Sequence, residues 1–154
     1  MRASGIILHI TSLPSPHGVG TLGREAREFA DFLRKAGQKY WQILPLGPTG
    51  YGDSPYQTDS AFAGNPYLID LEQLITDGLL TREEVDAVSF GSDPAQTDYG
   101  ALYAGRFDLL CRACERGWDK ERENVDAFYR ENESWLRSYA LYTAAKRHFG
   151  MRPW

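Results

Sequence analysis

The sequence predicts an α/β fold in which a strand–helix–strand unit precedes a mainly helical region. Residues 5–10 form a short continuous apolar run, which is typical of a strand buried on both faces. Residues 24–36 repeat apolar side chains at helical spacing, and residues 40–44 form a second β-prone run that Pro45 ends. This order of elements predicts two parallel strands joined by a right-handed crossover.

The second half of the sequence carries the clearer helix signals. Asp70 is placed to cap a helix over residues 71–77, and Thr81 with Glu84 forms a capping box for a short helix ending at Val88. Three longer helices are expected after residue 98. The first covers residues 99–116 and ends before Gly117, and the other two cover residues 120–131 and 134–149.

Composition and charge exclude several classes of protein. The 154 residues are 42% hydrophobic and carry a formal net charge of -4 without a Lys/Arg cluster, so neither nucleic acid nor a membrane surface is expected as a partner. No apolar run has the length of a membrane span, and the N-terminal apolar stretch is too short for a signal peptide. Two cysteines exclude a disulfide scaffold and favour a cytoplasmic location.

A glycine pattern at residues 18–23, GVGTLG, matches the dinucleotide-binding spacing G-x-G-x-x-G. That function requires the first glycine at the end of a strand and an acidic residue about twenty positions further on. Here residues 11–17 separate the strand from the glycines, and the second strand ends without an acidic residue. The pattern therefore predicts a flexible loop and no nucleotide cofactor.

The cysteines and histidines do not have the spacing of a metal-ligand set. Cys111 and Cys114 are interpreted as two small buried residues of one helix. His148 is interpreted as a cation at a helix C-terminus, whereas His9 and His17 are placed to border any site that the first loops build. The sequence thus predicts neither a metal nor any other cofactor.

A long loop over residues 47–67 is the segment most informative about function. It follows the second strand, so it leaves the edge of a parallel sheet where ligands bind. Its side chains combine aromatic rings with hydroxyl and amide groups, and its charged residues are Asp53 and Asp59 alone. Flat rings with neutral hydrogen-bonding groups suit a sugar, although the same tyrosines could simply pack the loop down. The residues alone favour neither interpretation.

Four segments identify a resemblance to a known family. They read HITSLP at residues 9–14, GVGTLG at 18–23, YWQILPLGPTGYGDSPY at 40–56 and SAFAGNPYLIDL at 60–71. Together they closely resemble the N-terminal part of the 4-α-glucanotransferases, the amylomaltase or disproportionating-enzyme family (glycoside hydrolase family 77). The resemblance covers essentially the whole chain, and it implies a glucan substrate and transfer of α-1,4-glucan segments by a retaining double displacement.

The resemblance also implies which parts of the enzyme lie outside this sequence. A (β/α)8 TIM barrel takes about 250 residues. We therefore expect residues 1–70 to form the first βαβ unit of the barrel with its aromatic loop. Residues 71–154 are expected to form a mainly helical inserted subdomain, truncated at its C-terminus, so the remainder of the barrel is an expected partner.

By the resemblance, the family's catalytic carboxylates lie in later strands of the barrel, outside this chain. They are the nucleophilic aspartate, the acid/base glutamate and a third aspartate. No catalytic residue is therefore expected in this chain. Asp53 and Asp59 could be nominated as a carboxylate pair, but the resemblance gives them no such role. We interpret them as solvated or turn-forming aspartates. By itself the chain is then expected to be inactive.

The resemblance assigns substrate-binding roles residue by residue. Ser54, Pro55 and Tyr56 match a segment that lines the donor sugar subsite. Tyr51 matches an aromatic residue of a second, outer glucan-binding site, and Tyr103 matches a tyrosine that reaches toward the acceptor cleft. Each of them also has an alternative role in packing. The expected ligands are malto-oligosaccharides, and the alternative function is a stand-alone glucan-binding module without catalysis.

Overall fold

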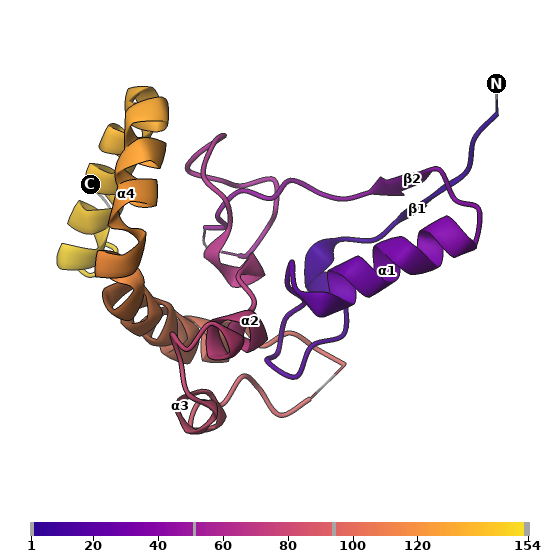
Figure 1. Ribbon diagram of the computed structural model, residues 1–154, viewed down its shortest axis with the longest axis horizontal. Helices are drawn as coiled ribbons and strands as arrows, with labels where there is room; N and C mark the ends of the chain where they lie inside the picture. The colour runs from indigo at the N-terminus through magenta and orange to yellow at the C-terminus, as the bar shows by residue number, and fades with distance from the viewer. Residues whose placement is uncertain (1, 51, 94, 153–154) are drawn as a thin grey trace.

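A computed structural model describes residues 2–50, 52–93 and 95–152. In chain order, its helices and strands are β1 (Gly5–Ile7), the 3-10 turn η1 (Ile10–Ser12), α1 (Arg24–Lys35), β2 (Tyr40–Gln42), the 3-10 turn η2 (Pro66–Leu68), α2 (Leu71–Thr76), α3 (Arg82–Asp86) and α4 (Tyr99–His148). The sheet and α1 lie at one end of the molecule, and α4 lies at the other (Figure 1).

The β-α-β unit is confirmed. β1 and β2 pair in parallel, with Gly5 opposite Tyr40, and α1 connects them. The pairing is reinforced by Trp41, whose indole Nε1 donates to the carbonyl of Leu8 at 2.8 Å. The ring of Phe29 on α1 packs edge-on against Trp41, with the two ring centroids 4.9 Å apart, so this aromatic contact holds the helix on the sheet.

The prediction that the first strand is buried on both faces is wrong for this chain. All three residues of β1 are exposed, and Ile7 keeps 68% of its surface accessible. The reason is that the sheet of the described residues has two strands only, and α1 is the helix that packs on it. Parallel strands become buried when further strands and helices cover both faces.

The main core lies between the helices that follow the loop. Leu71 of α2, Val85 of α3 and Leu102 of α4 are fully buried in one apolar cluster. Both predicted caps are confirmed. The carboxylate of Asp70 accepts from the backbone N–H of Glu72 at 3.0 Å, and a reciprocal capping box precedes α3.

The prediction of three separate helices after residue 98 is wrong, because α4 runs as one helical segment from Tyr99 to His148. This segment is not straight. Arg147 Nη1 lies 3.0 Å from Cys111 Sγ, whereas 36 residues of straight helix would span about 54 Å. α4 therefore reverses direction and forms two arms side by side, as Figure 1 shows. We call them the first arm, which contains Cys111, and the second arm, which contains Trp135 and Arg147.

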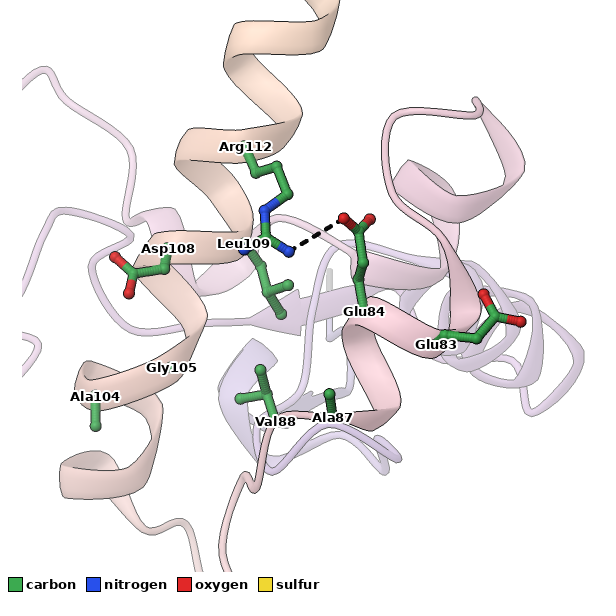
Figure 2. Close-up of a pocket in the computed structure, with 9 residues that line it drawn as sticks. All are labelled: Glu83, Glu84, Ala87, Val88, Ala104, Gly105, Asp108, Leu109 and Arg112. Carbon is green, nitrogen blue, oxygen red and sulfur yellow. Dashed lines mark hydrogen bonds and ion pairs between the residues drawn. The ribbon is translucent and has the colours of Figure 1, made fainter.

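Gly117 does not end a helix, because packing overrides the local signal. It is buried within the first arm, and a Cβ atom added there would lie 3.4 Å from Leu79. The absence of a side chain thus lets the first arm approach the segment between α2 and α3. Gly105 makes a closer approach, since an added Cβ would lie 2.3 Å from Cγ1 of Val88 on the facing segment (Figure 2).

These two glycines of α4 predict opposite effects of the same substitution. We expect Gly105→Ala to destabilise the protein by about 1–3 kcal/mol, because Val88 has to move in a packed core. We expect Gly117→Ala to be neutral or to stabilise by up to about 1 kcal/mol, because alanine favours the helix and meets only ordinary contacts. Thermal and urea unfolding measure both, and equal changes in the two variants would contradict this account of the packing.

Candidate functional site

The aromatic loop, residues 47–67, is folded into consecutive turns at the C-terminal edge of the sheet. The N–H of Asp53 donates to the carbonyl of Gly50 at 3.1 Å, and Gly50 in turn donates to Gln57 at 3.2 Å. At the base of the loop, the N–H of Asn65 donates to the carbonyl of Leu46 at 2.8 Å. This last bond closes the loop where it leaves β2, so its ends are fixed beside the strand ends.

A cavity of about 150 Å3 lies under this loop, and we call it the edge cavity. Its walls come from the segments that follow β1 and β2, from the aromatic loop and from the start of α4. The residues that line it are His9, Thr11, Ser12, Leu44, Pro45, Leu46, Thr49, Asp53, Pro55, Asn65, Leu68 and Tyr99. The strand ends and their loops therefore build a concave surface at the edge that the sequence indicated.

A larger cavity, of about 480 Å3, lies between α3 and α4 (Figure 2). Its charged lining residues are Glu83, Glu84, Asp108 and Arg112, and none of its residues comes from the aromatic loop. Glu84 is held by ion pairs to Arg112 at 3.1 Å and Arg116 at 2.7 Å. These charges join α3 to the first arm, so we assign the functional site to the edge cavity and its loop.

The structure places the sequence-predicted site residues at different distances from the edge cavity. Pro55 lines it, and the neighbouring Ser54 accepts a hydrogen bond from the N–H of Tyr56 at 3.3 Å. The side chain of Tyr56 is 72% exposed beside this segment. Tyr103 is exposed on the first arm, edge-on to Phe107, and does not line the cavity. Tyr51 lies outside the described residues.

The two aspartates of the loop have different surroundings. Asp53 lies in a turn with a positive φ of 52° and lines the edge cavity. The pKa of Tyr99 is raised mainly by burial and, to a smaller extent, by the negative charge of Asp53. Asp59 is exposed and hydrogen-bonded to Tyr142 of the second arm. Asp53 thus has the turn-forming role that the sequence predicted, and Asp59 connects the loop to α4.

Of the two histidines expected near the loops, only His9 lies at the edge cavity. Burial lowers the pKa of His9 from 6.5, which favours a neutral imidazole. His17 is buried elsewhere, with its ring edge-on to Phe90 and its Nε2 2.8 Å from Glu72 Oε1. The expectation that His17 borders the site is therefore wrong, because its ring belongs to the packing between the first loop and α2. His148 lies in the last turn of α4, as predicted.

The cysteine pair has no metal-binding geometry. No group of three metal-ligating side chains occurs within residues 2–50, 52–93 and 95–152. The prediction that both thiols are buried is wrong for Cys114, which points to solvent from the first arm. Cys111 is half-buried because the second arm covers it and brings Arg147 into contact.

No helix in the described part of the chain has the length and apolar character to cross a membrane.

Two contacts that hold the loop escaped the sequence analysis. Arg106 of α4 is fully buried, and its Nη2 donates to the carbonyls of Tyr67 at 3.2 Å and Ile69 at 2.5 Å. In the second contact, the ring of Phe62 stacks on Trp135 of the second arm at 5.7 Å. An arginine in a charge-rich helix and a distant aromatic pair give no local signal, so only tertiary structure reveals them.

Comparison with known proteins identifies the family. Residues 8–154 match the sequence model of a family that is described as 4-alpha-glucanotransferase. The chain belongs to this family. It is 52% identical over 157 residues to a 4-alpha-glucanotransferase of Thermus thermophilus and 46% identical over 154 residues to one of Streptococcus pneumoniae. Each alignment covers 99% of this chain but 30% of the relative, so the chain spans about three-tenths of the length of these glucanotransferases.

Relatives from plants and solved structures extend the comparison. A chloroplastic/amyloplastic 4-alpha-glucanotransferase of Solanum tuberosum is 36% identical over 165 residues, with 99% of this chain and 28% of the relative covered. An amylomaltase from Streptococcus agalactiae, solved in complex with acarbose, superposes with a TM-score of 0.92 at 45% identity, over 99% of this chain and 31% of that one. The β-α-β unit and the helical region therefore recur together in the family.

The ion pair of Glu72 with Arg82 and its hydrogen bond with His17 predict a pH dependence of stability. The carboxylate of Glu72 accepts hydrogen bonds from Arg82 at 2.6 Å and is 2.8 Å from His17 Nε2. The hydrogen bond from Arg82 has the larger effect, and together these contacts lower the pKa of Glu72 from 4.5 to about 2. Because the folded pKa is the lower one, the stabilisation is present above about pH 4.5 and is lost as the pH falls toward 2. We expect Glu72→Gln to be less stable than the wild type at pH 7.

Urea unfolding at pH 7, 4 and 3 measures this difference in the free energy of unfolding. It is expected to shrink steadily as the pH is lowered, because the wild-type carboxylate loses its charge. Glu133→Gln, on an exposed position of α4, is the matched control and should show little difference at any pH. A Glu72→Gln difference that stays constant from pH 7 to 3 would show that the charge of this carboxylate contributes nothing to stability.

Proposed function

We propose that this chain is the N-terminal part of a 4-alpha-glucanotransferase that transfers α-1,4-glucan segments between malto-oligosaccharides by a retaining double displacement. One observation carries the proposal: 99% of the chain aligns at 52% identity with a 4-alpha-glucanotransferase, and the alignment includes the complete aromatic loop. The amylomaltase that superposes at a TM-score of 0.92 was solved with acarbose, which supports an oligosaccharide ligand.

In this proposal, residues 1–70 form the first βαβ unit of a (β/α)8 barrel, and residues 71–154 belong to a helical insertion. The parallel pair β1 and β2 is what such a barrel begins with, and the exposed strand residues, such as Ile7 and Tyr40, offer a surface to further strands and helices. The partner of this surface is the remainder of the same barrel. Cytoplasmic location is part of the proposal, since the two cysteines are free thiols.

The proposed roles of the site residues follow from their side chains. Tyr56 offers an exposed aromatic face against which the C–H groups of a donor sugar can pack, next to Ser54 and Pro55. Tyr103, exposed on the first arm, is assigned to the acceptor side, and Tyr51 to a second, outer glucan site. The nucleophile and the acid/base are two carboxyl groups about 5 Å apart, which the proposal places in the downstream part of the barrel.

Tyr56→Ala tests the donor-site assignment. In the complete glucanotransferase that carries this chain, we expect the variant to lose up to about a hundredfold in transfer rate, because the reacting sugar is no longer held in place. Tyr56→Phe keeps the ring and should retain most of the activity. Disproportionation of maltotriose measures the rate, and Tyr129→Ala, another exposed tyrosine, serves as the control. A wild-type rate in Tyr56→Ala would refute the role.

The 154-residue chain without the rest of the barrel is expected to show no transferase activity. It lacks the downstream carboxylates that form the glycosyl-enzyme and protonate the leaving oxygen. The purified chain is incubated with maltotriose, and glucose and longer maltodextrins are followed by chromatography beside the active complete enzyme. Turnover that disappears in an Asp53→Asn, Asp59→Asn double variant would instead make these aspartates catalytic.

A further inference from the structure

We infer that three aromatic side chains, Phe62, Phe128 and Trp135, form an additional binding surface for long α-1,4-glucan chains, which we call the aromatic platform. The inference rests on the proposed function and deepens it, because none of these residues belongs to the segments assigned above to the donor, acceptor and outer glucan sites. It follows from the exposure of the rings, from the contacts that fix them and from the charge beside them.

The platform joins two exposed rings through a third, partly buried one. Phe62 of the aromatic loop is 71% exposed, and Phe128 of α4 is 52% exposed. Trp135 contacts both, since its ring centroid is 5.7 Å from that of Phe62 and 6.5 Å from that of Phe128. The two exposed rings therefore belong to one contiguous surface and lie no more than about 12 Å apart, a separation that a short run of sugar rings can span.

Hydrogen bonds hold these rings in place before any ligand binds. The indole Nε1 of Trp135 donates to the side-chain oxygen of Asn132 at 3.0 Å, and Asn132 Nδ2 donates to the carbonyl of Phe128 at 2.9 Å. On the loop side, the hydroxyl oxygen of Ser60 accepts from the backbone N–H of Phe62 at 3.2 Å. The surface is therefore preorganised, which lowers the conformational entropy lost when a ligand binds.

Attachment of the loop to the second arm explains only part of this arrangement. The stack on Trp135 uses one face of the Phe62 ring, and most of the side chain stays accessible. Phe128 packs edge-on against Trp135 of its own helix, and this contact adds no tie between the loop and α4. Neighbouring exposed apolar side chains are typical of an interaction site, so the outer faces of the two phenylalanines indicate a ligand.

The platform lies on a part of the surface that the remainder of the barrel is not expected to cover. Phe128 and Trp135 belong to α4, which lies at the opposite end of the molecule from β1 and β2 (Figure 1). The exposed strand residues, such as Ile7, are the ones that offer a surface to further strands. The rings of the platform are therefore expected to stay accessible in the complete protein.

The chemistry of the platform favours a neutral carbohydrate. The face of an aromatic ring is negatively polarised, and it attracts the C–H groups that cover the face of a sugar ring. A negative charge lies beside the platform, because burial, and then the carboxylate of Asp59, raise the pKa of Tyr139, whose ring centroid is 6.3 Å from that of Trp135. This charge disfavours a polyanion and can accept hydrogen bonds from hydroxyl groups.

The position of the platform along the chain favours a long glucan. Phe62 belongs to the same loop as Tyr56, the exposed tyrosine of the proposed donor segment. In this proposal, a long chain held at Tyr56 continues onto the platform and gains a second set of contacts. A trisaccharide occupies the donor segment without reaching them, so the platform increases the preference of the enzyme for long chains.

Phe62→Leu and Phe128→Leu test the platform in the complete glucanotransferase, because each keeps an apolar side chain and removes the flat ring. We expect the ratio of kcat/KM for long-chain amylose to kcat/KM for maltotriose to fall about 3- to 10-fold in each variant, the effect of one aromatic contact. Phe62→Tyr and Phe128→Tyr keep the ring and should retain the wild-type ratio. The matched control is Phe149→Leu, whose exposed ring lies against His148 at the end of α4.

The ratio is the decisive measurement, because a variant that only loosens the aromatic loop slows both reactions together. An unchanged ratio in both leucine variants would overturn the platform, and an accompanying change of oligomeric state in sedimentation would make the surface an interface between copies of the protein. If the melting temperature shows that one variant does not fold, the ratio of the other decides. A wild-type enzyme inactive on both substrates would overturn the proposed function together with the platform.

Discussion

The buried guanidinium of Arg106 is the contact on which the position of the aromatic loop depends. It lies at 0% exposure in the helical core and donates to the two carbonyls of Tyr67 and Ile69, where the loop returns to α2. Desolvation lowers its pKa to about 10 because burial disfavours the charge, and the nearby carboxylate of Asp70 acts in the opposite direction. Asp70 also caps α2 and lies so close to Gly23 that no side chain fits there. The starts of α1 and α2 and the first arm of α4 therefore meet at one junction.

From this junction outward, the loop is held at several points. The bond from Asn65 to Leu46 closes its base, while Phe62 and Asp59 attach its far side to Trp135 and Tyr142 of the second arm. A loop fixed in this way loses less conformational entropy when a ligand binds. The segment between these points presents the exposed ring of Tyr56 next to Pro55, which lines the edge cavity.

Sequence reasoning succeeded where the determinants are local. The caps at Asp70 and Thr81 depend on side chains within three residues, and the β-α-β unit depends on short apolar runs. It failed where distant contacts decide. The reversal of α4 is held by Arg147 against Cys111, and Gly117 stays helical because Leu79 packs on it. The glycine pattern at residues 18–23 has a packing role that only the structure reveals, because a side chain at Gly20 would collide with the carbonyl of Ile10.

The two-armed α4 has a mechanical consequence. Its second arm is tied to the first by Arg147, and it supports the far side of the aromatic loop through the Phe62–Trp135 stack. The hairpin thus supports the loop from one side. A movement of the second arm is therefore expected to displace the part of the loop that contains Phe62. Residues on the hairpin that lie away from the edge cavity can therefore set how freely the loop moves, and with it the entropic cost of ordering the loop around any ligand.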